Sequence, residues 1–147
     1  MYETFWTRMG NHPFNLDVRT LSDYETHFTV MNYGYQYIDV PNGPEYALQF
    51  DQTYNGIITW KEMHRRICLT IKEVLLAAQT QYPAMANFRS RAVYGIDVMI
   101  TEDFVPKILE FTYSPDCKRA CVSNPTFYND LFECLFYGKV HNMTLIP

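Results

Sequence analysis

The stretch that decides the fold of this 147-residue chain is Val93-Tyr-Gly-Ile-Asp97-Val-Met-Ile100, followed by Thr-Glu-Asp-Phe and then by Val105-Pro-Lys-Ile-Leu-Glu110-Phe-Thr112. Two runs of β-branched and aromatic residues flank a short polar joint, which predicts an antiparallel hairpin. Because side chains alternate along a strand, one face of the hairpin should be apolar and the other polar. The predicted apolar face contains Ile96, Val98, Ile100, Leu109 and Phe111.

The polar face of this hairpin should carry Asp97, Glu110 and Thr112. The short turn brings Asp97 close to Glu110, and directly opposed residues have Cβ atoms ~4.5–5.5 Å apart. Two carboxylates at that distance repel each other, and a divalent cation between them would explain the pair, because Mg²⁺ takes one or two carboxylates together with phosphate oxygens and water. The alternative is that both acids face solvent in a register that differs by a residue or two.

Two helices are expected to pack on the sheet that contains the hairpin. The first is predicted over residues 59–81, where Thr59-Trp-Lys-Glu62 fits a capping box and apolar residues recur at helical spacing until Pro83. The second is predicted over residues 125–137, from a proline at the first helical position to a stop at Gly138. We therefore expect an α+β fold with a mostly antiparallel sheet packed by two main helices.

The first third of the chain is predicted to hold two strands and a long loop. The runs Tyr2–Arg8 and His27–Met31 are rich in β-prone residues. From Asn32 to Asn55, recurrent glycine and proline indicate a long loop or an inserted segment, and such loops are usually functional or disordered.

Composition excludes several classes of protein. A net charge of −4 argues against nucleic-acid binding, and no run of 18 apolar residues is present that would span a membrane. The start of the chain lacks the features of a signal peptide, so we expect a cytoplasmic location. All four cysteines are expected to be reduced thiols, since no secretion signal accompanies them and no zinc-binding spacing occurs.

The hairpin motif resembles the tubulin–tyrosine ligase-like family. Tyr94-Gly-Ile-Asp97, followed by Ile108-Leu-Glu110-Phe-Thr112-Tyr-Ser-Pro115, is similar to the end of that family's ATP-grasp core. The run Pro115-Asp-Cys-Lys-Arg-Ala-Cys121 and the segment from His27 to Tyr33 resemble one member in particular. The resemblance implies that Asp97 and Glu110 hold Mg²⁺ on the phosphates of ATP. Thr112 stands where the family usually has asparagine.

The same resemblance implies a fold, an activity and a partner. Residues 1–147 would be a single partial domain, the C-terminal half of an ATP-grasp fold without the half that carries the phosphate-gripping lysines. ATP-grasp ligases convert a carboxylate to an acylphosphate that an amine then displaces, here at the acidic C-terminal tail of tubulin. Arg8 falls where the family has an arginine that faces the nucleotide and substrate cleft. The alternatives are a catalytically inactive module that binds tubulin or another partner, and a truncated gene product.

Overall fold

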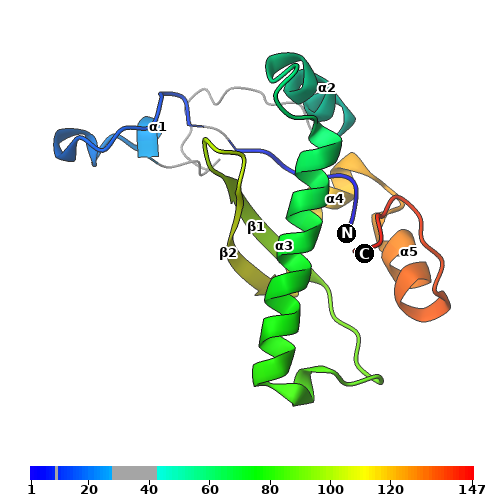
Figure 1. Cartoon of the computed structure of the whole chain (residues 1–147). Helices are drawn as coiled ribbons and strands as arrows, with labels where there is room; N and C mark the ends of the chain where they lie inside the picture. The colour runs from blue at the N-terminus through cyan, green and yellow to red at the C-terminus, as the bar shows by residue number, and fades with distance from the viewer. Residues whose placement is uncertain (9, 28–42) are drawn as a thin grey trace.

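The computed structural model describes residues 1–8, 10–27 and 43–147. This part of the chain is a mixed α+β arrangement in which a two-stranded antiparallel sheet lies beside a long central helix (Figure 1). The described elements are α1 (Tyr24–His27), α2 (Pro44–Thr53), α3 (Trp60–Gln81), β1 (Tyr94–Ile100), β2 (Pro106–Tyr113), α4 (Lys118–Ser123) and α5 (Phe127–Phe132), with short 3-10 turns at Val18–Thr20 and Pro83–Met85 and a π-helical turn at Glu133–Tyr137.

The predicted helix over residues 59–81 is confirmed as α3. The Thr59 hydroxyl caps it by accepting a hydrogen bond from the backbone N–H of Glu62 at 3.3 Å. The Glu62 carboxylate instead accepts from Arg65 at 2.7 Å and from Arg66 at 3.0 Å. These two guanidinium groups lower the pKa of Glu62 to about 2. Helix α3 ends just before Pro83, whose ring cannot continue it.

The main core lies between α3, α2 and the inner face of the hairpin. Met63, Ile67 and Ile71 recur on one side of α3 and are buried, with Met63 fully enclosed. They form a cluster with Phe50 of α2. The hairpin side chains that pack on this cluster are Ile96, Val98, Ile100, Ile108 and Phe111. Burial of these apolar groups is what holds the hairpin on α3.

A β-bulge in β2 corrects the predicted apolar face. Asp97 pairs with Glu110, but the next residue, Val98, pairs with Ile108, so Leu109 is the extra residue on β2. The Leu109 side chain is 60% exposed, and Ile108 takes its place against the core. The prediction that Leu109 faces the core was wrong, because strict alternation fails where one strand carries an additional residue.

The predicted long loop from Asn32 to Asn55 was wrong in its second part. Residues 28–42 lie outside the described residues, and with them most of the predicted strand His27–Met31, whose first residue ends α1. Residues 44–53 form α2, with Pro44 in the first turn of the helix. Tyr46 and Phe50 are four residues apart on α2 and contact the Trp60 ring. That aromatic packing stabilises a helix where glycine and proline indicated a loop.

The segment Tyr2–Arg8 is not a strand in this structure. Within the described residues it makes a single isolated bridge, between Tyr2 and Met143 near the other end of the chain. The predicted helix over residues 125–137 is confirmed as α5 and the π-helical turn, which stops at Gly138 in the left-handed region. Its packing was predicted wrongly, since α5 lies beside the two ends of the chain instead of covering the sheet (Figure 1).

Two further predictions concern the chain as a whole. All four cysteines are free thiols, as expected. In the described part of the chain, no helix combines the length and the apolar character that a membrane span requires.

Candidate functional site

The outer face of the hairpin brings together three of the four predicted site residues. Asp97 and Glu110 are direct cross-strand partners, and Thr112 follows Glu110 by two residues on the same strand, opposite Gly95. All three side chains are exposed on the face that points away from α3. The Thr112 hydroxyl donates a hydrogen bond to Glu110 Oε1 at 2.7 Å. The predicted pairing of the two acids is therefore confirmed.

Neither acid of this pair has an ionic partner in the part of the chain that the structure describes. Among the described residues, the ion pairs involve other acids, and neither Asp97 nor Glu110 takes part in one. Two opposed carboxylates with no neutralising side chain repel each other. Their oxygens are hard donors of the type that Mg²⁺ prefers, so the residues present fit that cation. The exposed face leaves room for the water and phosphate oxygens that Mg²⁺ keeps.

The bulge adds one residue that sequence analysis missed. Lys107 pairs with Met99, whose side chain is exposed beyond Asp97 on the outer face. Strict alternation from Glu110 would have turned Lys107 toward the core, but the extra residue Leu109 shifts it to the face of the two acids. A lysine there offers a positive charge for an anionic group next to the carboxylate pair.

Gly95 makes room for the end of the hairpin motif. A Cβ at this position would lie 3.0 Å from Cβ of Pro115 and 3.8 Å from Cβ of Thr112. Pro115 follows Ser114, whose φ of 52° is in the left-handed region. Just after Thr112 the chain therefore turns back and brings Pro115 close to Gly95. A side chain at position 95 would crowd Pro115, which explains why the glycine and the proline occur together in the motif.

Arg8, the fourth predicted site residue, is not joined to this face. Its side chain is exposed on the N-terminal segment. Within the described ranges, no hydrogen bond or ion pair involves Arg8. Its role in binding an anion stays a prediction.

A second group of potential metal ligands lies in the N-terminal segment. Ligand atoms of His12, Asp23 and Glu25 lie within 4.8 Å of one another. Each acid is already engaged: Asp23 accepts from the Thr26 hydroxyl at 2.8 Å, and Glu25 accepts from the Asn11 amide at 3.2 Å. These bonds account for the local turn, so we regard the cluster as structural.

Asp130 is a buried carboxylate of a different kind, with 7% of its surface exposed. It accepts hydrogen bonds from Asn142 at 2.9 Å, from Tyr2 at 2.9 Å, from Asn124 at 3.0 Å and from Thr126 at 3.2 Å. These bonds, first among them the one from Asn142, lower the pKa of Asp130. Its acceptor sites are filled by protein groups, so it joins the chain ends to α5 and is not a ligand site.

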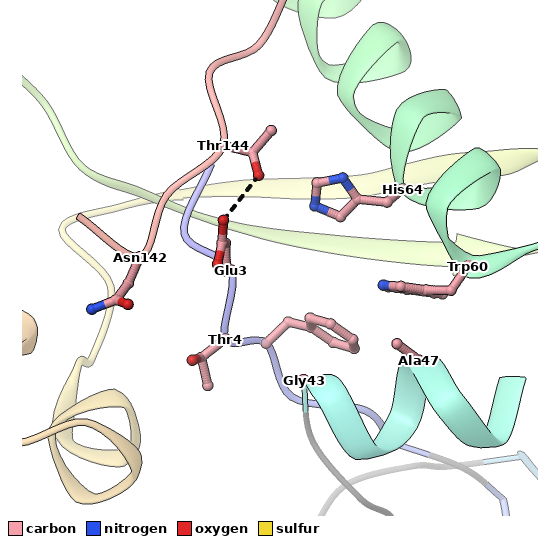
Figure 2. A pocket seen from close by; sticks show the side chains of 9 residues that line it. Glu3, Thr4, Gly43, Ala47, Trp60, His64, Asn142 and Thr144 are labelled. Atoms are coloured by element: carbon pink, nitrogen blue, oxygen red, sulfur yellow. Dashed lines mark hydrogen bonds between the residues drawn. The ribbon is translucent and has the colours of Figure 1, made fainter. Parts of the chain in front are cut away.

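A pocket of about 340 Å³ opens between the chain ends, α2 and α3 (Figure 2). Phe5 and Trp60 form an aromatic wall, with ring centroids 4.9 Å apart and planes inclined by 26°. The other lining residues are Glu3, Thr4, Gly43, Ala47, His64, Asn142 and Thr144. No sequence motif indicated this pocket, because its residues come from four separate segments.

Comparison with known proteins agrees with the resemblance noted above. The sequence profile of the tubulin-tyrosine ligase family matches residues 1–144. The chain is 37% identical to tubulin–tyrosine ligase-like protein 12 of Mus musculus over 96% of its own length, 34% identical to the Homo sapiens protein over 95%, and 32% identical to the Caenorhabditis elegans protein over 100%. It spans about a quarter of the length of these relatives, 23–24%. No solved structure matches the chain significantly.

Proposed function

The chain belongs to the tubulin-tyrosine ligase family, and from this premise we propose that its hairpin supplies the metal-binding carboxylates of an ATP-dependent ligase that attaches amino acids to tubulin tails. One observation carries the proposal: Asp97 and Glu110 oppose each other in register on an exposed face, and neither has an ionic partner among the described residues. The proposal concerns a ligase to which this chain contributes one part.

Each residue of the outer face has a distinct task in this proposal. Asp97 and Glu110 bind Mg²⁺ through carboxylate oxygens, and Thr112 fixes the Glu110 side chain by its 2.7 Å hydrogen bond. Bound with ATP, the metal would neutralise charge on the transferring phosphoryl group. Lys107 adds a positive charge for a phosphate on the same face. Arg8 pairs with an anionic group, either a phosphate or the acidic tubulin tail.

The first test is the thermal midpoint of the purified chain with and without Mg-ATP. A ligand at 100 times its dissociation constant adds ~2.7 kcal/mol to stability, so a bound nucleotide gives a clear upward shift. We expect the Asp97→Asn/Glu110→Gln double variant to abolish that shift. The matched control is Glu102→Gln/Asp103→Asn, which removes two exposed acids from the turn of the same hairpin and should leave the shift intact.

Titration with Mn²⁺ alone, read by broadening of NMR signals near the hairpin, tests the metal site without nucleotide. Broadening centred on β1 and β2 that the double variant removes would support the proposal. Broadening spread over all surface acids, unchanged in the double variant, would contradict it.

A second function is favoured by one observation, the hydrogen bond of Thr112. Thr112 stands where the family usually has asparagine, so this position offers no amide oxygen to a metal. Its hydroxyl donates a hydrogen bond to Glu110. A protein that binds tubulin without modifying it fits such a site. In that case the chain would bind an acidic tail peptide equally well with and without Mg-ATP. A Thr112→Asn variant that strengthens Mn²⁺ binding would show that this position limits the metal site.

A further inference from the structure

Two of the four cysteines lie one helical turn apart at α4, away from the hairpin face. Cys117 directly precedes this helix and Cys121 lies within it, and the backbone N–H of Cys121 donates to Cys117 O at 3.0 Å. Residues at this spacing have Cβ atoms ~5–6 Å apart. Both cysteines are half-buried free thiols, whereas Cys68 is buried in the core.

The groups around this pair bring the two sulfur atoms toward each other. Cys117 Sγ donates a hydrogen bond to Pro115 O at 3.3 Å. A helical side chain leans toward the N-terminus of its helix, so Cys121 is directed at the turn that begins with Cys117. Tyr128 of α5 donates a hydrogen bond from its hydroxyl to the Cys121 sulfur. The charge of Cys121, followed by that of Cys117, raises the pKa of the Tyr128 phenol, so both sulfur atoms lie near the same hydroxyl group.

A direct disulfide does not fit this pair, but a bridging ion does. A disulfide needs Cβ atoms about 3.5–4.5 Å apart, which is less than the ~5–6 Å of residues one turn apart on a helix. A metal ion between the sulfur atoms replaces the S–S bond of about 2 Å by two metal–sulfur bonds of roughly that length each. The longer link lets α4 keep its shape.

The number of ligands selects the metal. Thiolates are soft ligands, and in proteins they bind Cu(I), zinc and iron–sulfur clusters. A structural zinc site takes four ligands, and an iron–sulfur cluster is held by four cysteines. In the part of the chain that the structure describes, neither Cys117 nor Cys121 belongs to a group of three histidine, cysteine or carboxylate ligands within 4.8 Å of one another. Cu(I) accepts two thiolates as a complete set of ligands, so it is the ion that this pair fits.

We propose that Cys117 and Cys121 bind one Cu(I) ion as a pair of thiolates. Two S–H bonds break and two Cu–S bonds form, the two protons pass to water, and copper keeps its oxidation state. Cys117 gives up its hydrogen bond to Pro115 O, while Tyr128 still donates to the Cys121 sulfur and orients it. The proposal is independent of the ligase function, because neither cysteine lies on the hairpin face.

The test is a titration of the whole reduced chain with Cu(I) in the absence of oxygen, in competition with the coloured chelator bicinchoninate. Native mass spectrometry counts the bound ions. We expect one Cu(I) per chain in both measurements. Absence of binding, or several ions bound with equal affinity, would overturn the proposal.

Single substitutions locate the ion. Cys117→Ser and Cys121→Ser each remove one of two ligands and should weaken Cu(I) binding by about 100-fold or more, whereas Tyr128→Phe removes only a hydrogen bond to a ligand and should weaken it by roughly 10-fold. The matched control is Cys134→Ser, which changes another half-buried cysteine, on the π-helical turn, and should leave the affinity unchanged. If Cys134→Ser weakened binding as much as Cys117→Ser, or if both Cys117→Ser and Cys121→Ser bound like the unchanged chain, the proposal would fail.

A reagent for paired thiols tests the geometry in the unchanged chain, so that this result does not depend on how a variant folds. Phenylarsine oxide forms two As–S bonds with thiols that lie close together and releases one water. We expect it to protect Cys117 and Cys121 from alkylation by iodoacetamide and to leave Cys134 reactive, as read by peptide mass spectrometry. Alkylation of Cys117 and Cys121 at the same rate with and without the arsenical would show that the sulfur atoms do not meet, and would overturn the proposal.

Discussion

The two faces of the β1–β2 hairpin differ in what keeps their residues in place. On the inner face, Ile96, Val98 and Ile108 pack on the α3 core, so their identity follows from burial. On the outer face, Asp97 and Glu110 are exposed and face each other, and among the described residues neither has an ionic partner or packs on the core. The contrast shows where chemistry is to be sought: on the face whose residues packing does not explain.

The largest expected effect is a difference in the free energy of unfolding between alanine variants of two methionines, one on each side of the hairpin. Met63 is fully buried under the inner face, so Met63→Ala should lower the free energy of unfolding by about 2–5 kcal/mol. Met99 lies on the outer face with 57% of its surface exposed, and Met99→Ala should change stability by less than about 0.5 kcal/mol. Urea denaturation of both variants measures the difference. Comparable losses would mean that both faces of the hairpin are packed.

A pair of adjacent residues tests the bulge. Ile108→Ala should cost about 1–3 kcal/mol, since its partly buried side chain packs on the core, while Leu109→Ala should cost less than about 0.5 kcal/mol. The two substitutions remove similar side chains one position apart. If Leu109→Ala were the more damaging, the register Asp97–Glu110, Val98–Ile108 would be wrong, and simple alternation would hold.

Acid should weaken the polar contact that ties α3 to the hairpin turn. Arg66 donates to Phe104 O at 3.2 Å and to Glu62, whose pKa is about 2 against a usual value of 4.5. Because the pKa is depressed in the folded state, the contribution to stability is present above pH 4.5 and is lost as pH falls toward 2.

The measurement is the thermal midpoint between about pH 5 and pH 2 for the unchanged chain and for Glu62→Gln. The variant should lose less stability over this range. Glu73→Gln, which removes another exposed acid from α3, is the control and should follow the unchanged chain. Parallel curves for all three proteins would show that Glu62 contributes nothing.

The smallest expected effect belongs to the outer face. Without metal, the Asp97→Asn/Glu110→Gln double variant should be as stable as the unchanged chain or more stable by about 0.2–1 kcal/mol, because it removes the repulsion of two opposed carboxylates. Urea denaturation in the presence of a chelator measures this. A loss of stability would show that the acids have a structural role, and the contrast between the two faces would fail.

Much of the hairpin and of α3 could be predicted from sequence, because their signals are local. The Thr59 cap, the apolar spacing of α3 and the two β-prone runs each act within a few residues. The helix α2 could not be recognised in the same way. Its proline and the preceding glycine indicate a loop, and only the packing of Tyr46 and Phe50 against Trp60 decides for a helix.

The sequence by itself predicted that Asp97 and Glu110 lie close together on neighbouring strands, since a short turn joins the strands, and it left their register open. The structure pairs them directly, through the bulge at Leu109. The sequence also determined the family, through the residues around that pair. The tertiary structure decided that Ile108 and not Leu109 enters the core, that Lys107 joins the acids, and that four distant segments enclose a pocket around Glu3. The physical reason is that bulges and pockets depend on how separate segments pack, and no periodicity within one segment records that packing.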